Sequence, residues 1–141
     1  MDQEQLQLQL DVSDVDGKEK LVRQVQDAKD VREALARTSS RPEVVATLLK
    51  AVNQEDSAVF IWGATGLAIV TVLENHFDGR FAFVVWGQND RHFTVKQVAP
   101  VIELWAETKN CKRVAAAVDR AGPWRRLTGY SPWKLIISKE I

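Results

Sequence analysis

Residues 57–86 constrain the fold of this chain more than any other stretch. They form three apolar runs, 57–62, 67–74 and 80–86, separated by glycines and by the Asp78-Gly79 pair. Val, Ile, Phe, Thr and Trp dominate these runs, and such residues fit a pleated, half-buried strand. Asp-Gly between two apolar runs is typical of a hairpin whose two central turn residues both have positive φ. The stretch therefore predicts three consecutive antiparallel strands.

Two helices are predicted before these strands. Between residues 18 and 37, apolar residues recur at steps of three and four, which is the pattern of an amphipathic helix packed on a sheet. The segment from Thr38 to Arg41 breaks this pattern. Pro42 suits the first position of a second helix, which is expected to end near Asn53.

A third helix is predicted after the strands. Thr94 and Gln97 have the spacing of a capping box, so this helix begins near Thr94, or only near Pro100, and ends near Asn110. Further elements follow: a strand over 112–118, a short helix over 122–127 and a last strand over 133–138. A helix between strands 80–86 and 112–118 predicts that these two strands pair in parallel, through a right-handed crossover.

The first residues alternate strictly between apolar and polar. Leu6, Leu8, Leu10 and Val12 share one face of residues 5–12, which predicts a strand. Residues 1–13 are then either an edge strand of the sheet or an arm that pairs with another chain. Leu6, Leu8 and Leu10 are therefore candidate interface residues, with a homo-oligomer as one outcome.

Composition narrows the classes of function. The 141 residues fit a single domain, 1–141. Lys plus Arg (19) equals Asp plus Glu (19), so no net charge attracts nucleic acid or lipid headgroups, and binding to either is disfavoured. The longest apolar run is shorter than the roughly 20 residues of a membrane-spanning helix. A soluble protein of the cytoplasm, or one packaged from it, is expected.

Few residues carry metal or redox chemistry. His76, His92 and Cys111 are the only histidines and the only cysteine, and none has the short spacing of a zinc site, so no metal is predicted. Cys111 suits a small buried position. Trp124 and Trp133 lie in a locally basic segment, and since Trp and Arg anchor interfaces, they are candidates for contact with another protein.

The order of these elements resembles the GNAT superfamily of N-acetyltransferases. That resemblance implies an α/β (α+β) fold with a mixed, mostly antiparallel sheet and helices on both faces. Residues 57–141 match best, and their end resembles small GNAT-like proteins of tailed bacteriophages, which implies a place in the host cytoplasm or the virion. The matching positions are Trp105-Ala106, Asn110-Cys111, Gly122-Pro-Trp124, Arg125-Arg126, Leu127, Gly129-Tyr130 and Lys139-Glu-Ile141.

Activity in that superfamily depends on a loop that holds the cofactor's diphosphate, with the motif Gln or Arg, two residues, Gly, any residue, Gly or Ala. Here the loop would be residues 87–93, with a single glycine at its start and Asp90 adding negative charge. We therefore expect a non-catalytic protein without a cofactor, acting through protein contacts in virion structure, assembly or host takeover. The alternative is an acetyl-CoA-dependent N-acyltransferase with a divergent loop. Its cofactor-binding residues would be Gly87, Gln88, Asn89, Arg91, His92 and Thr94.

This sequence matches the catalytic residues of such enzymes only weakly. The family's acidic tyrosine, four residues before the Gly-aromatic pair, falls on Arg125, and Tyr130 is the aromatic of the pair itself. Glu74 is the one obvious carboxylate near the end of a central strand, but it stands in a polar turn that favours solvation. No catalytic residue is expected in the non-catalytic interpretation, and Glu74 and Tyr130 are the candidates in the alternative.

Overall fold

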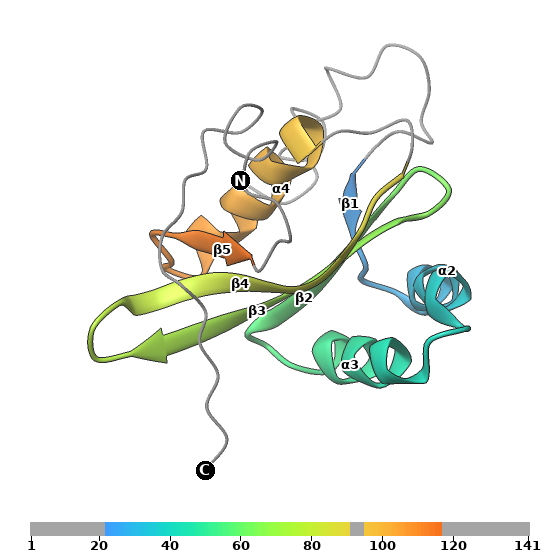
Figure 1. Ribbon diagram of the computed structural model, residues 1–141, viewed down its shortest axis with the longest axis horizontal. Helices are drawn as coiled ribbons and strands as arrows, with labels where there is room; N and C mark the ends of the chain where they lie inside the picture. Colours follow the sequence, from blue (N-terminus) through green and yellow to red (C-terminus); the bar gives the residue numbers. More distant parts are fainter. Residues whose placement is uncertain (1–21, 91–94, 117–141) are drawn as a thin grey trace.

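A five-stranded sheet with helices on both faces forms the part of the protein that is described, residues 22–90 and 95–116 of a computed structural model (Figure 1). The strands lie in the order β1-β2-β3-β4-β5. The elements are β1 (Arg23–Gln24), α2 (Ala28–Thr38), α3 (Pro42–Val52), β2 (Ser57–Trp62), β3 (Gly66–Asn75), β4 (Gly79–Gln88), α4 (Val95–Thr108) and β5 (Val114–Ala116). This mixed, mostly antiparallel α/β architecture confirms the predicted fold class.

Helices α2 and α3 cover one face of the sheet (Figure 1). Helix α2 is capped by Asp27, whose carboxylate accepts a hydrogen bond from the Asp30 amide at 2.8 Å. Helix α3 begins with Pro42 in its first turn, as predicted, because that position needs no amide donor. The core on this face consists of Val25, Ala34, Val44, Leu48, Ala51, Val59, Ile61, Leu67 and Ile69.

Helix α4 covers the opposite face. Its Trp105 meets Phe60 of β2 edge-on, with ring centroids 6.2 Å apart. Trp62, Ala68, Val70 and Ala82 from three neighbouring strands pack in the same core, together with Val98 and Ile102 of α4. Alternate side chains of β2 therefore pack into the core under α4 and into the core under α2 and α3, which explains why every residue of this strand is buried.

Strand β4 contains a β-bulge at Val85. Ile69 of β3 pairs with Trp86, whereas the next residue, Val70, pairs with Val84, so Val85 is an additional residue. The bulge reverses the alternation of faces: Val84 packs with the α4 core, and Trp86 packs with the α2–α3 core. The end of β4 is thereby rotated relative to its beginning.

Strands β4 and β5 pair in parallel, as the sequence predicts. The paired residues run from Ala82 with Val114 to Val84 with Ala116. The pairing that is described thus ends immediately before the bulge, and the β4 residues after it have no partner on this side among the described residues.

Two local predictions are wrong. The helix expected over residues 18–37 begins only at Ala28, because Arg23 and Gln24 pair with β2 and Asp27 caps the helix. The turn between β3 and β4 is also longer than a two-residue turn, since Asn75 pairs with Gly79 and, of the turn residues, only Gly79 has positive φ. The side chain of Asn75 closes this turn by accepting hydrogen bonds from the amides of Phe77 and Asp78.

Other predicted elements lie outside the described residues. They are the strand over residues 5–12, the short helix over 122–127 and the strand over 133–138. Within the described ranges, no helix is long and apolar enough to cross a membrane.

Candidate functional site

The candidate site is the connection from β4 to α4. It begins with Gly87 and Gln88 at the end of β4, continues through Asn89 and Asp90, and reaches α4 at Val95. The first turn of α4 contains no acidic residue. Since the N-terminus of a helix carries partial positive charge and free amides, this end of α4 is suited to an anion.

The carboxylate of Asp90 lies against the turn between β2 and β3. Its carboxylate accepts hydrogen bonds from the amides of Ala64 at 2.8 Å and Thr65 at 3.1 Å, and the residue is 4% exposed. Gly63, with φ of 58°, makes room for this carboxylate, because a Cβ at that position would overlap it. Backbone donors therefore hold the negative charge that the sequence placed in the phosphate loop.

Arg37, near the end of α2, holds the same turn from the other side. Its guanidinium donates to the carbonyls of Trp62 at 2.9 Å and Gly63 at 2.7 Å, and also to that of Gly66. Burial is the largest influence on the pKa of Arg37 and lowers it, while the charges of Glu33 and Asp90 oppose the shift. We call Arg37, the turn Gly63–Thr65 and Asp90 together the turn clamp.

Thr65 contacts three consecutive residues of the β4–α4 connection, Gln88, Asn89 and Asp90. Its carbonyl accepts a hydrogen bond from the Gln88 carboxamide at 2.8 Å, and its hydroxyl donates to the Asn89 carbonyl at 3.1 Å. Its amide donates to the Asp90 carboxylate. Residues 88–90 are thus fixed against the β2–β3 turn before the chain continues toward α4.

The end of β4 leaves space around Gly87. Among the described residues, a Cβ added to Gly87 would meet only Val84, at 3.9 Å, an ordinary van der Waals contact. Val85 is 39% exposed at the bulge. This end of β4 therefore offers an accessible stretch of strand backbone beside an uncrowded glycine.

The predicted site residues fall into two groups. Gly87, Gln88 and Asn89 lie together at the end of β4, whereas Arg91, His92, Thr94 and Tyr130 lie outside the described residues, as do Leu6, Leu8, Leu10, Trp124 and Trp133. Gln88 is held by Thr65 and Arg37, whose carbonyls accept from its side chain.

Glu74, in β3, lies beside the opposite end of β4 from this connection. It pairs in the sheet with Arg80, and its carboxylate also meets the Arg80 guanidinium at 3.5 Å. Arg80 and Gln88 are eight positions apart along β4, which corresponds to roughly 26 Å. Glu74 is exposed there and has no contact with the β4–α4 connection.

Sequence reasoning missed the two supports of the turn, Arg37 and Thr65, and assigned Asp90 the wrong direction. The closely spaced Gly63 and Gly66 were a usable signal, because such a pair marks a turn that another group approaches closely. Nothing in the sequence distinguished Arg37 from the other charged residues of its helix.

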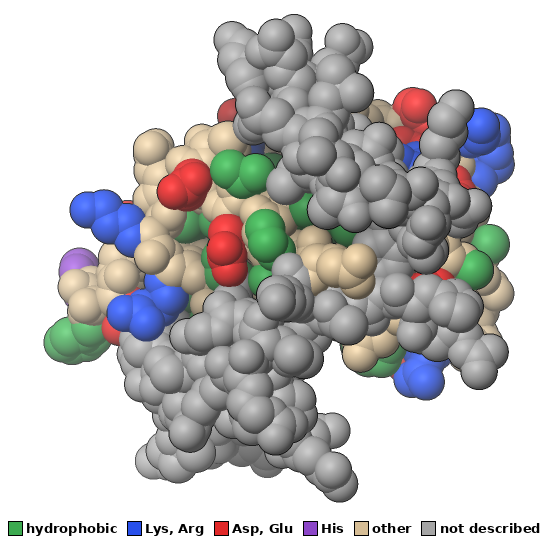
Figure 2. Space-filling view, turned by 90° about the horizontal axis from the view of Figure 1, so that it is seen from above, with side chains coloured by type: hydrophobic (Ala, Val, Ile, Leu, Met, Phe, Trp, Pro, Cys, Tyr) green, Lys and Arg blue, Asp and Glu red, His purple; other side chains and the backbone are tan. Residues whose placement is uncertain are grey.

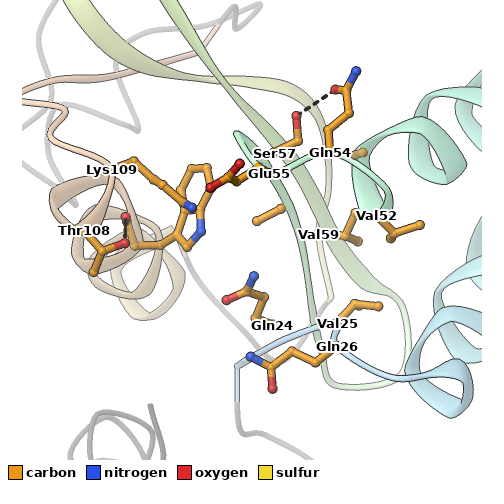
Figure 3. A pocket seen from close by; sticks show the side chains of 13 residues that line it. Gln24, Val25, Gln26, Val52, Gln54, Glu55, Ser57, Val59, Thr108 and Lys109 are labelled. Atoms are coloured by element: carbon orange, nitrogen blue, oxygen red, sulfur yellow. Dashed lines mark hydrogen bonds between the residues drawn. The ribbon is translucent and has the colours of Figure 1, made fainter. Parts of the chain in front are cut away.

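A separate hollow lies at the β1–β2 edge of the sheet, with a volume of about 420 Å³. Figure 3 shows Thr108, the last residue of α4, and the next residue Lys109 on one side of it, Gln54 and Val52 on the other, and Gln24 between them. It lies at the Ser57 end of β2, whereas the turn clamp follows Trp62 at the other end. The hollow is therefore distinct from the candidate site.

No candidate metal site is found in the part of the chain that the structure describes. The described residues include no group of three or more His, Cys, Asp or Glu side chains that could hold a metal ion. Seen from above, the coloured residues carry basic, acidic and hydrophobic side chains in small separate groups (Figure 2).

The fold is that of the GNAT acetyltransferases, which the solved structures similar to it establish. AAC(6')-Iy in complex with the bisubstrate analogue CoA-S-monomethyl-acetylneamine has a TM-score of 0.65 at 15% identity, over 85% of this chain and 97% of that one. The same aminoglycoside N-acetyltransferase in complex with CoA gives 0.63 at 14%, over 85% and 98%. A putative acetyl transferase from Pyrococcus furiosus gives 0.57 at 17%, over 85% and 98%. The sequence matches no family model and no curated protein.

These likenesses correct two predictions. A non-catalytic protein without a cofactor was expected, but the solved structures that share the fold are described as acetyltransferases, and three of them hold CoA, acetyl-CoA or a CoA analogue. The expectation rested in part on the charge of Asp90 in the phosphate loop, and that carboxylate is instead bound by the amides of Ala64 and Thr65. Nothing among these structures links the chain to bacteriophage proteins.

Proposed function

We propose that the protein is an acetyl-CoA-dependent N-acyltransferase. The observation that carries this proposal is the end of β4, which extends past its described pairing with β5 and leads through residues 87–90 to the N-terminus of α4. An accessible strand edge pairs well with the two amides of a pantetheine arm, as an added strand would. The helix N-terminus that follows suits the diphosphate of the same molecule.

The reaction sets simple demands on the site. The acceptor amine attacks the thioester carbonyl in its neutral form and an N–C bond forms. The C–S bond then breaks, the nitrogen releases one proton, and the departing thiolate takes one up. Tyr130 stays the candidate donor of the proton that the thiolate takes up.

Direct binding of acetyl-CoA tests the proposal. Calorimetric titration should give saturable binding with one site per chain. At 100 times the dissociation constant, acetyl-CoA should stabilise the fold by about 2.7 kcal/mol and raise its melting temperature by several degrees. Transfer of labelled acetyl to members of an amine panel would then identify acceptors. Absence of binding at millimolar acetyl-CoA would disprove the proposal.

Gly87→Phe provides a matched variant. Gly87 has an ordinary φ and free space around its missing Cβ, so the substitution is compatible with folding, but its ring would cover the accessible end of β4. Binding of acetyl-CoA should be lost while the melting temperature without ligand changes little. Gly79→Ala, at the opposite end of β4, should leave binding intact.

Two finer predictions remain proposals. The resemblance of the C-terminal residues to phage proteins, with a place in the host cytoplasm or virion, rests on the sequence motifs alone. Contact with another protein or a second copy through Leu6, Leu8, Leu10, Trp124 or Trp133 also rests on sequence. Light scattering of the intact chain and of a chain lacking residues 1–12 would test the N-terminal part of this prediction.

A further inference from the structure

The edge of β2 beside β1 is only partly paired. Strand β1 pairs with residues 60–61 of β2, and the Val25 amide still donates to the Val59 carbonyl at 2.7 Å before the chain turns into α2. The N–H and C=O groups of every second residue of a strand point to the same edge, so those of Ser57 point to the β1 side as those of Val59 do. Among the described residues, the backbone of Ser57 has no partner on this edge. An unpaired strand edge of this kind accepts a further strand.

The hollow of about 420 Å³ lies beside this unpaired stretch, between the ends of α3 and α4 (Figure 3). Its lining toward α2 and α3 is mostly apolar and consists of Val25, Ala51, Val52 and Val59, with Gln54 beside them. Its lining toward α4 carries the polar groups of Gln24, Thr108 and Lys109, next to Trp105. Gln24 belongs to this side because it pairs directly with Phe60, a residue of the α4 core. A strand in the hollow would therefore present alternate side chains to an apolar wall and to a polar wall.

Residues 5–12 have the alternation that these two walls require. One face carries Leu6, Leu8, Leu10 and Val12, and the other carries Gln5, Gln7, Gln9 and Asp11. A glutamine carboxamide both donates and accepts hydrogen bonds, so the second face suits Gln24 and Thr108. Asp11 on the same face is opposite in charge to Lys109. The segment therefore matches the hollow in hydrophobic pattern and in charge.

We infer that residues 5–12 dock in the hollow of their own chain, as an edge strand beside Ser57. Arg23 pairs with Ile61, which is four strand positions from Ser57 and thus roughly 13 Å away. Residues 12–22 can span roughly 33 Å, so the chain is long enough to reach the hollow. The short tether also keeps the segment at a high effective concentration, which favours its own chain over a second copy. Of the two placements that the sequence predicts, an edge strand or an arm, the hollow thus supports the edge strand.

This docking is independent of the proposed function. The hollow lies at the Ser57 end of β2, away from the β4–α4 connection. A strand there would cover an edge of the sheet that is otherwise open to pairing with other chains.

Disulfide formation in the full chain tests the docking. Cys111→Ala removes the only native cysteine, and Thr108→Cys then places a thiol on the α4 side of the hollow. A second cysteine is introduced at one position from 5 to 10. Because only one face of the strand points toward α4, the fastest of Gln5→Cys, Gln7→Cys and Gln9→Cys should form an intramolecular disulfide at least about fivefold faster than any of Leu6→Cys, Leu8→Cys and Leu10→Cys.

The opposite wall provides the matched control. Val52→Cys in place of Thr108→Cys puts the thiol on the side of α3, and the preference should then reverse in favour of the leucine positions. In urea, where the strand is absent, all six positions should react at similar rates with either partner.

Hydrogen exchange gives a second measurement that needs no cysteine. Leu8→Asp places a carboxylate against the apolar wall, whereas Gln7→Asp places the same group on the polar face. Exchange in a peptide covering residues 55–59 should be about tenfold faster in Leu8→Asp than in the unmodified protein, and unchanged in Gln7→Asp.

Three outcomes would overturn the inference. The first is equal disulfide rates at all six positions in the folded chain, and the second is exchange at residues 55–59 that Leu8→Asp leaves unaltered. The third is disulfides that join two chains, because they would assign the segment to a second copy. None of these measurements involves acetyl-CoA, so the docking and the proposed function stand or fall separately.

Discussion

The guanidinium of Arg37 donates a hydrogen bond to the carbonyl of Gly63 at 2.7 Å, and this contact joins the end of α2 to the turn between β2 and β3. The two residues are 26 positions apart in the sequence. The same guanidinium also donates to the carbonyls of Trp62 and Gly66, so one side chain binds three carbonyls. A planar guanidinium allows this geometry, and an ammonium does not. Helix α2, the β2–β3 turn and residues 88–90 are thereby parts of one connected structure.

Removing the three hydrogen bonds from Arg37 to these carbonyls should destabilise the whole fold. We expect Arg37→Ala to lower the free energy of unfolding by about 3 kcal/mol, since it leaves buried carbonyls without donors. Arg37→Lys should recover part of that loss, because one ammonium cannot reach all three carbonyls in the same geometry. Urea unfolding followed by circular dichroism measures both. Arg32→Ala, on the exposed side of the same helix, should cost less than about 0.5 kcal/mol.

The two glycines with positive φ should respond differently to alanine. Gly63 has φ of 58° and its missing Cβ would overlap the Asp90 carboxylate, whereas Gly79 has φ of 72° and nothing within 4 Å. Gly79→Ala should therefore cost about 1 kcal/mol of backbone strain, and Gly63→Ala clearly more than that, because Asp90 must also move. Equal losses in thermal unfolding would contradict the contact with Asp90.

Two adjacent leucines of α3 should differ sharply. Leu48 is fully buried between the helix and the sheet, and Leu49 is 42% exposed. Leu48→Ala should lower the free energy of unfolding by about 3–5 kcal/mol through lost burial and a residual cavity. Leu49→Ala should cost less than about 1 kcal/mol. The unfolding midpoint in guanidinium chloride should therefore fall much further in Leu48→Ala than in Leu49→Ala, and equal midpoints would contradict the prediction.

Cys111 should be an unreactive thiol in the folded protein. Burial raises its pKa, with the charge of Arg80 opposing the shift and that of Asp56 adding to it. Because the unfolded thiol ionises first, near pH 8.5, stability from this group is present below that pH and is lost as pH rises through the higher folded value. Cys111→Ala should remove this contribution to the loss of stability at alkaline pH.

A thiol-specific chromophoric reagent gives the direct measurement for Cys111. At pH 8 the native protein should react far more slowly than the urea-unfolded protein, and the single cysteine makes the signal unambiguous. Equal rates in the two states would show that the thiol is accessible and that burial does not control its pKa.

Local sequence patterns predicted most of the described fold. Alternating apolar residues located β2, β3 and β4 to within two residues, and Pro42 marked the start of α3, because these signals come from the segments themselves. Arg23 and Gln24 were assigned to a helix, since the three- and four-residue spacing of apolar residues continues across them. Their pairing with Ile61 and Phe60 is a long-range contact that no local pattern encodes.

The candidate site was harder to predict for the same reason. The sequence located the loop but assigned Asp90 to the anion side, because the partners of Asp90 lie 25 and 26 positions earlier in the chain. Because the loop also lacks the glycines of the family's diphosphate-binding motif, the sequence suggested that acetyltransferase activity had been lost. The structure shows that Thr65, on another turn, binds Gln88 and Asn89 at the start of the loop, so a motif based on the loop alone is an incomplete test of function.

The extra residue at Val85 lets β4 lose one residue at that point without changing which side chains face each core. If Val85 were deleted, Val84 and Trp86 would become neighbours on opposite faces, so Trp86 would still pair with Ile69 and Gly87 would stay on the side of α4. Related chains that lack this bulge should therefore be shorter by one residue between the hairpin and Trp86.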